Sequence, residues 1–320
     1  MTQVVQSSFS PPSIIANRHI QTLYGPLAVT VKYHPQTWQS VTLTDGDFVE
    51  LAWFGERSKR TLLILHGLEG SYRSHYVQRL LNAYLGHGWQ VVVAHFRGCG
   101  RSLNRLPRSY HSGSSDDLAD VLSALSAHSI ENLYAIGFSL GGNVLLKWLG
   151  ENKVQNSIRR AMAVSVPFKL DICADSIDRG FSRFYQKHLI DSLKFKVSKK
   201  HQLGESALPN ALLNDLSSIR NFWQFDEHFT APMNGFSGAS DYYAKASSFP
   251  FIARINTPTL LLQALDDPFL SPEAIPRAED LGPSVTLELS EKGGHVGFLQ
   301  SFNAYKECFI AQRSFSFFMG

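Results

Sequence analysis

The chain has 320 residues, of which 44% are hydrophobic and 18% charged, a composition typical of a soluble globular protein that can bury a full core. Its formal net charge of +3 comes from 30 basic and 27 acidic residues, and this balance argues against a nucleic acid or polyanionic partner. The three cysteines, Cys99, Cys173 and Cys308, are widely spaced and indicate neither a disulfide framework nor a metal site. This cysteine usage predicts a cytoplasmic protein.

The N-terminal region shows no targeting pattern. The first nine residues lack a basic stretch followed by an apolar one, so we expect no signal peptide. No window approaches 18 uninterrupted apolar residues, so no integral membrane segment is expected either. Residues 1–27, punctuated by Pro11, Pro12, Gly25 and Pro26, are interpreted as an N-terminal arm with one or two helical turns. Three β-branched and aromatic runs then predict an antiparallel meander over 28–33, 39–43 and 48–53.

From residue 61 onward, strand patterns alternate with helix patterns. Continuous apolar runs predict buried strands at 61–65, 89–94, 133–138 and 161–166. Apolar residues at helical spacing predict helices at 76–85, 116–127 and 144–149, the second with Ser115 as its N-cap. The alternation predicts an α/β fold with a mostly parallel eight-stranded sheet and helices on both faces.

The alternation stops after Pro167 and resumes with the strands 259–265 and 285–289 and helices near 272–279 and over 299–317. Helical patterns at 181–195 and 212–222 predict an α-helical cap insertion, about 168–251, within a single domain that spans 1–320. Most cap aromatics are expected to pack the cap onto the core, and some to line an apolar pocket between sheet and cap. They are Phe181, Phe184, Tyr185, Phe222, Trp223, Tyr242 and Tyr243.

A Gly-x-Ser-x-Gly motif joins the strand at 133–138 to the helix at 144–149. Such a turn from strand to helix forms a nucleophile elbow, in which the serine has a strained backbone and faces the space above the sheet. Bulky side chains two positions away would clash, which accounts for Gly137 and Gly141 around Ser139. The motif alone is weak, but this context favours Ser139 as a nucleophile.

A serine nucleophile needs a histidine base and a carboxylate that orients it, in the chain order Ser, Asp or Glu, His in this kind of fold. Two aspartates, Asp266 and Asp267, follow the strand at 259–265, and we favour Asp267, with Asp266 binding backbone in the turn. Asp171 is an alternative acid. His295, in a glycine-rich loop after the last strand, is the expected base.

Two backbone N–H groups are expected to hold the oxyanion: that of Leu140, which follows the nucleophile, and that of Leu68, in the loop after the strand at 61–65. The remaining polar candidates receive structural interpretations. His66 is expected behind the oxyanion loop, Arg97 and Arg101 in loop salt bridges, and Cys99 as a small packing residue. His111, Asp116 and Asp117 are read as turn and cap residues. No histidine pair has metal-ligand spacing, so no metal and no cofactor are expected.

Several motifs together resemble the YheT-type branch of the α/β-hydrolases, which also includes eukaryotic abhydrolase-domain lipases. They are Asn17-x-His19-x-Gln21-Thr22, His66-Gly67-Leu68-Glu69-Gly70-Ser71, Arg97-Gly98-Cys99-Gly100, the elbow, Asp266-Asp267-Pro268-Phe269 and Gly293-Gly294-His295-Val296-Gly297-Phe298. The resemblance implies a Ser139, Asp267, His295 triad and activity on carboxylic or lipid esters. The eukaryotic relatives usually carry an N-terminal membrane anchor, so their membrane-lipid substrates do not transfer directly.

The sequence therefore predicts a serine carboxylesterase that cleaves short- to medium-chain or lipid esters through an acyl-enzyme. An acyltransferase or a thioester or lipid hydrolase would use the same triad. A third hypothesis is a hydrolase fold kept as a binding module, which predicts no labelling of Ser139 by a fluorophosphonate. A small-molecule ester is the only partner indicated, and the sequence does not indicate the oligomeric state.

Overall fold

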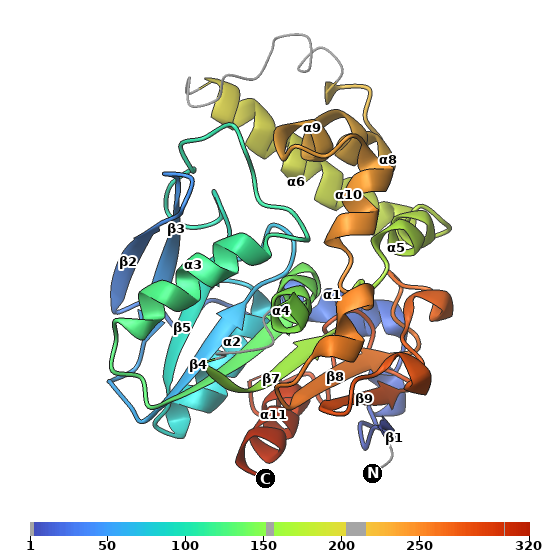
Figure 1. Ribbon diagram of the computed structural model, residues 1–320. Helices are drawn as coiled ribbons and strands as arrows, with labels where there is room; N and C mark the ends of the chain where they lie inside the picture. The colour runs from blue at the N-terminus through green and yellow to red at the C-terminus, as the bar shows by residue number, and fades with distance from the viewer. Residues whose placement is uncertain (1–2, 152–156, 203–215, 304) are drawn as a thin grey trace.

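The computed structural model describes residues 3–151, 157–202, 216–303 and 305–320 (Figure 1). Within these ranges nine strands form one sheet in the order β1-β9-β8-β7-β6-β4-β5-β3-β2. Strand β3 is antiparallel to both β2 and β5, whereas the other neighbouring pairs are parallel. The strands are β1 (Val4–Gln6), β2 (Thr37–Thr42), β3 (Phe48–Phe54), β4 (Arg60–Leu65), β5 (Gln90–His95), β6 (Asn132–Phe138), β7 (Ile158–Val164), β8 (Thr259–Ala264) and β9 (Val285–Ser290).

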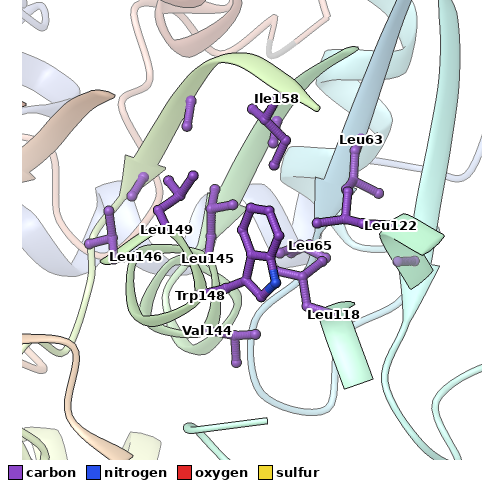
Figure 2. Close-up of a cluster of buried hydrophobic side chains, with 14 of the residues drawn as sticks. Leu63, Leu65, Leu118, Leu122, Val144, Leu145, Leu146, Trp148, Leu149 and Ile158 are labelled. Carbon is purple, nitrogen blue, oxygen red and sulfur yellow. The ribbon is translucent and has the colours of Figure 1, made fainter. Parts of the chain in front are cut away.

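The sheet is covered by helices on both faces, as the alternating pattern predicts. Along β4, Leu63 and Leu65 belong to one apolar cluster, while Leu62 and Ile64 belong to the other. Helices α3 (Ser115–Ser126) and α4 (Leu140–Glu151) pack on the first face, and α2 (His75–Gly86) and α11 (Phe309–Met319) on the second. Figure 2 shows Trp148 of α4 among leucines of α3 and β4. These layers fix the carboxyl ends of the parallel strands at one edge of the sheet.

Between β7 and β8 lies a run of helical segments, which we call the cap helices. They are α5 (Leu170–Ile177), α6 (Ser182–Gln202), α8 (Phe222–Phe225), the π-helix η2 (Asp226–Thr230), α9 (Ala231–Met233) and α10 (Ala239–Ala246), followed by the 3₁₀ turn η3 (Phe249–Arg254). Figure 1 places most of them beyond the sheet, at the end opposite α11. Of the helix expected at 212–222, residues 212–215 lie outside the described ranges, and α8 begins only at Phe222. No helix in the described part of the chain is long and apolar enough to span a bilayer.

The N-terminal region differs from the prediction in two respects. The sheet has nine strands in the described chain rather than eight, because residues Val4–Gln6 add a parallel strand beside β9. Three residues are too few to show a strand pattern in sequence. The strand expected at 28–33 is wrong. Helix α1 (Arg18–Ala28) occupies its start, and the backbone N–H groups of Lys32 and Tyr33 then donate to the Gln78 side chain instead of to another strand.

Two helices near the C-terminus also differ from the prediction. Instead of one helix near 272–279 there are two 3₁₀ turns, η4 (Pro272–Ala274) and η5 (Ala278–Asp280), separated by Pro276, which cannot donate an internal hydrogen bond. Helix α11 begins at Phe309, ten residues later than expected. The chain before it is bound to α1 by side chains: Leu299 donates its N–H to Gln21, and Tyr24 donates to the carbonyl of Phe302. Ser115 is the first residue of α3 rather than its N-cap, which is Ser114.

Candidate active site

The predicted elbow lies where β6 ends at Phe138 and α4 begins at Leu140. Ser139 between them has a φ of 49°, in the left-handed region that non-glycine residues avoid. A Cβ on Gly141 would be 2.4 Å from the carbonyl oxygen of His66, and one on Gly137 would be 2.6 Å from that of Gly141. Both glycines are therefore required by backbone packing around the turn, as the motif predicts.

The three residues predicted as a triad form one hydrogen-bonded chain. His295 Nε2 lies 3.1 Å from Ser139 Oγ, and His295 Nδ1 lies 2.9 Å from Asp267 Oδ2. Asp267 is buried, and its other oxygen accepts the N–H of Phe269 at 2.9 Å. The Phe269 ring stacks on the imidazole with centroids 4.0 Å apart and planes 11° apart, which fixes the plane of the ring. This geometry lets His295 remove the Ser139 proton while Asp267 holds the imidazole.

The alternative acids lie elsewhere. Asp171 is exposed in the first turn of α5 and is not the partner of His295 Nδ1. Asp266 Oδ1 accepts the N–H of Gly294 at 2.9 Å, so Asp266 binds backbone in the histidine loop as expected. Burial raises the pKa of the Asp266 carboxyl.

Helix α1 supports the histidine loop, a role that the sequence analysis did not assign. Thr22 Oγ1 accepts the N–H of His295 at 3.0 Å, and a Cβ on Gly294 would lie 2.7 Å from that same oxygen. A Cβ on Gly297 would be 2.1 Å from the carbonyl oxygen of Gln21. The buried Gln21 side chain also donates to the carbonyls of Ile15 and Leu299. The unusual polar content of the arm, Gln21 and Thr22 included, was the signal that could have revealed this contact.

The predicted oxyanion loop lies beside the nucleophile. A Cβ on Gly67 would be 3.4 Å from Ser139 Cβ, and the N–H of Gly67 itself donates to Tyr76 Oη at 2.8 Å. Among the described residues, no protein acceptor is found for the N–H of Leu68 or of Leu140. Both donors are thus available on the two segments that flank Ser139, which is the requirement for an oxyanion hole.

A partly buried ion pair connects this loop to the cap helices. Glu69, directly after Leu68, has its carboxylate 2.6 Å from Lys196 Nζ on α6. The same carboxylate accepts the Tyr110 hydroxyl at 2.7 Å and the Ser192 hydroxyl at 3.3 Å. Lys196 Nζ also lies 3.0 Å from the sulfur of Cys99. The sequence did not single out Glu69 or Lys196, because their pairing depends on how α6 lies over the sheet.

The other predicted polar residues hold structure. His66 is fully buried, accepts the N–H of Phe96 through Nε2 and donates from Nδ1 to the carbonyl of Gly67; burial lowers its pKa to about 3. Arg97 is buried against Asp45, Asp47 and Asp117, and Arg101 pairs with Glu50. Burial raises the pKa of the Cys99 thiol to about 11, which disfavours the thiolate that a cysteine nucleophile needs.

His111 and the two acidic residues after it also hold the start of α3. His111 donates its N–H to Ser114 Oγ, and burial lowers the pKa of its imidazole to about 3. Asp116 pairs with Arg108. In the described chain, no group of three His, Cys, Asp or Glu side chains is placed to hold a metal ion.

Backbone strain is concentrated at this edge of the sheet. Among the described residues, five non-glycine residues have positive φ, and all follow the carboxyl ends of β4, β6, β7 or β9. They are Glu69, Ser139, Ser165, Val296 and Phe298. Ser165 is part of the same network, because its hydroxyl accepts the N–H of Val296 at 3.1 Å. Such conformations cost about 1–3 kcal/mol each and persist where the surroundings enforce them, which is common at functional sites.

A cavity of about 690 Å³ opens over the nucleophile, between this edge of the sheet and the cap helices. Ser139, Leu140, Leu68 and His295 line its floor, and mostly apolar side chains line the rest. Of the seven predicted cap aromatics, Phe184, Tyr185, Phe222, Tyr242 and Tyr243 line the cavity, whereas Phe181 and Trp223 do not. Trp223 instead donates to Asp175 and packs on Tyr243.

Comparison with known proteins identifies the family. Residues 60–302 match the model of the alpha/beta hydrolase fold. The chain belongs to this family. It is 38% identical to the provisionally assigned esterase YheT of Escherichia coli (strain K12), over 96% of this chain and 92% of that protein. It is 28% identical to the human phospholipase ABHD3, over 88% of this chain and 71% of that protein. The esterase Pf2001 of Pyrococcus furiosus has the same fold, with a TM-score of 0.59, 19% identity, and coverage of 97% and 98% of the two chains. The resemblance seen in the sequence motifs is thus confirmed.

Proposed function

We propose that the protein is a serine esterase that cleaves carboxylic esters through an acyl-enzyme on Ser139. The observation that carries the proposal is the hydrogen-bonded chain Ser139–His295–Asp267 on the floor of an apolar cavity. The names esterase and phospholipase of the two relatives above agree with ester hydrolysis. In this proposal the chain acts as one domain, with the cap helices as the roof of the substrate site.

The reaction has two halves. Ser139 Oγ attacks the ester carbonyl as His295 Nε2 takes its proton, and the N–H groups of Leu68 and Leu140 bind the oxyanion. The imidazolium then protonates the departing alcohol, which leaves an acyl group on Ser139. Water, deprotonated by the same histidine, releases the acid and restores the serine. Asp267 keeps the Nδ1–H of His295 directed toward itself.

The cavity favours esters with an extended acyl chain. Its volume of about 690 Å³ is larger than an acetyl or propionyl group would fill. Its walls are predominantly apolar, as a hydrocarbon chain requires. Each methylene moved from water onto such walls gains about 0.8 kcal/mol, so medium chains should react with lower KM than very short ones. We therefore propose medium-chain or lipid esters as the substrate class.

Replacing Ser139 by Ala tests the assignment directly. The variant should lose turnover of a p-nitrophenyl ester and labelling by a fluorophosphonate probe, with an unchanged circular dichroism spectrum. Unchanged turnover in Ser139→Ala would contradict the proposal. An acyl-length series of p-nitrophenyl esters then locates the preferred chain, and product analysis with added glycerol separates hydrolysis from transfer to an alcohol.

A further inference from the structure

Exposed apolar side chains concentrate on two elements of the molecule. Large hydrophobic residues are exposed at ten positions of the described chain, and five of them lie on α1, on α6 or directly before α6. These five are Ile20, Leu27, Phe181, Phe184 and Phe195. Single exposed apolar residues are normal on a protein surface, but a cluster of them marks an interaction site.

The two elements are in contact. The His19 ring on α1 lies 4.5 Å from the ring of Phe181, and His19 Nδ1 lies 2.9 Å from the hydroxyl of Tyr185 on α6. Phe181 and Phe184 are themselves adjacent, with ring centroids 5.9 Å apart. The exposed residues of α1 and of the first turn of α6 therefore form one continuous surface, rather than two separate ones.

This surface surrounds the opening of the cavity that holds Ser139. Leu27 and Phe184 both line the cavity, yet they are 83% and 60% exposed, so they stand at its mouth. Ile20, Leu23 and Leu27 are three and four residues apart and share one face of α1. Leu23 lines the cavity, so this apolar stripe continues from the interior onto the surface. We call Ile20, Leu27, Phe181 and Phe184 the mouth rim.

The elements that carry the mouth rim are basic. The first 44 residues contain no Asp or Glu, and Arg18 and Lys32 lie within them. Helix α6 has six Lys or Arg residues and a single acidic one, Asp191; Arg183, Lys187 and Lys199 are exposed, whereas Lys196 pairs with Glu69 and Lys200 is buried. Apolar side chains surrounded by positive charge are the features that bind a membrane surface with anionic lipids. The same positive charge disfavours a second copy of this chain at the rim, because like charges would face one another.

We propose that the mouth rim docks on the surface of an anionic lipid bilayer, so that a lipid ester passes from the membrane directly into the cavity. This inference rests on the proposed esterase function for its substrate, but docking itself requires no turnover. The apolar rim residues enter the headgroup boundary, and the exposed basic side chains of Arg18, Arg183, Lys187 and Lys199 contact lipid phosphates. A lipid then reaches Ser139 without crossing water.

Vesicle binding tests the docking. In an inactive Ser139→Ala background, the protein should cosediment with vesicles of equal parts phosphatidylcholine and phosphatidylglycerol, and less with phosphatidylcholine alone or at high salt. The double variant Ile20→Ser, Phe181→Ser should weaken this binding by about tenfold or more, because both side chains leave the rim. Met319→Ser is the matched control: Met319 is exposed on α11, far from the cap helices in Figure 1, and its loss should change nothing.

Hydrolysis of a dissolved ester separates this inference from the esterase assignment. Ile20 and Phe181 do not line the cavity, so the double variant made with Ser139 intact should keep the kcat/KM of the wild type on p-nitrophenyl butyrate and lose activity only on vesicle-borne esters. Absence of vesicle binding by a protein that hydrolyses the dissolved ester overturns the docking alone. Equal losses in Met319→Ser also overturn it, as does a concentration-dependent dimer that the double variant abolishes. Lack of activity on the dissolved ester contradicts the esterase function instead.

Discussion

The carboxyl edge of the sheet and the cap helices each bury a carboxylate, and the two carboxylates have different hydrogen-bond partners. At the edge, Asp267 has a histidine nitrogen and a backbone N–H as partners. In the cap, Asp226 accepts the hydroxyls of Thr230 and Tyr243, and burial raises its pKa to about 6. The edge also contains all five positive-φ non-glycine residues of the described chain. Positive-φ residues and a carboxylate paired with histidine thus lie at the proposed catalytic edge, whereas the cap helices enclose the cavity.

The edge should respond most strongly to loss of its carboxylate. Asp267→Asn keeps the shape of the side chain but favours the wrong tautomer of His295, so kcat/KM on a p-nitrophenyl ester should fall about 10³- to 10⁴-fold. Asp171→Asn, which removes the alternative acid, should leave the rate within about twofold. Comparable losses in the two variants would contradict the assignment of Asp267. Thermal melts of both proteins control for folding.

The arrangement of the candidate site was predictable because each of its parts is local in sequence. The elbow, Asp267 and His295 each follow an apolar strand pattern within a few residues, and the parallel sheet brings those strand ends together. The segments that carry Leu68 and Leu140, the proposed oxyanion donors, also directly follow apolar strands. The contacts between Thr22 and His295, and between Glu69 and Lys196, join segments more than 120 residues apart. The polar residues of the N-terminal arm were a signal for the first contact, but no local pattern at Glu69 or Lys196 indicates the second, and neither pairing was predicted.

Irregular segments limited the fold prediction for a related reason. The chain at 29–35 is extended but pairs with a glutamine side chain, and the chain before α11 is held by Gln21 and Tyr24. Their residues have the composition of a strand and of a helix, so local preference was overruled by tertiary contacts. In the cap, helices were recognisable, but their mutual packing and the cavity they form depend on contacts that no periodicity encodes.

The cap carboxylate should affect stability and its pH dependence. Because the pKa of Asp226 is raised in the folded state, its protonated form is favoured there, and ionisation of the carboxyl lowers the free energy of unfolding. The favourable contribution is complete below the ordinary pKa near 3.8 and is lost as pH rises through about 6. The loss amounts to at most about 3 kcal/mol at pH 8. Asp226→Asn does not titrate, so its free energy of unfolding relative to wild type should improve by up to that amount between pH 4 and pH 8. Urea unfolding at the two pH values measures this, and parallel pH profiles would refute the prediction.

Support of the histidine loop by α1 should have a smaller effect. Thr22→Val keeps the volume of the side chain but removes the oxygen that accepts the His295 N–H, and so loosens the loop. We expect kcat to fall about tenfold with little change in KM, as for a loss of positioning. Thr22→Ser, which keeps the hydroxyl, should restore most of the rate. A rise in KM at constant kcat would instead place Thr22 in substrate binding.

The smallest effect is expected where the two regions meet, at the ion pair between Glu69 and Lys196. Lys196→Met leaves the Glu69 carboxylate, whose side chain is only 12% exposed, without its cation, and the loop that carries the Leu68 N–H must shift to hydrate it. We expect kcat to fall about three- to tenfold, and Lys199→Met, an exposed lysine on the same helix, to have no effect. Adding Glu69→Gln to Lys196→Met removes the unpaired charge and should recover part of the rate. Additive losses in the double variant would mean that the cap and the oxyanion loop act independently, and that this ion pair does not connect substrate enclosure to catalysis.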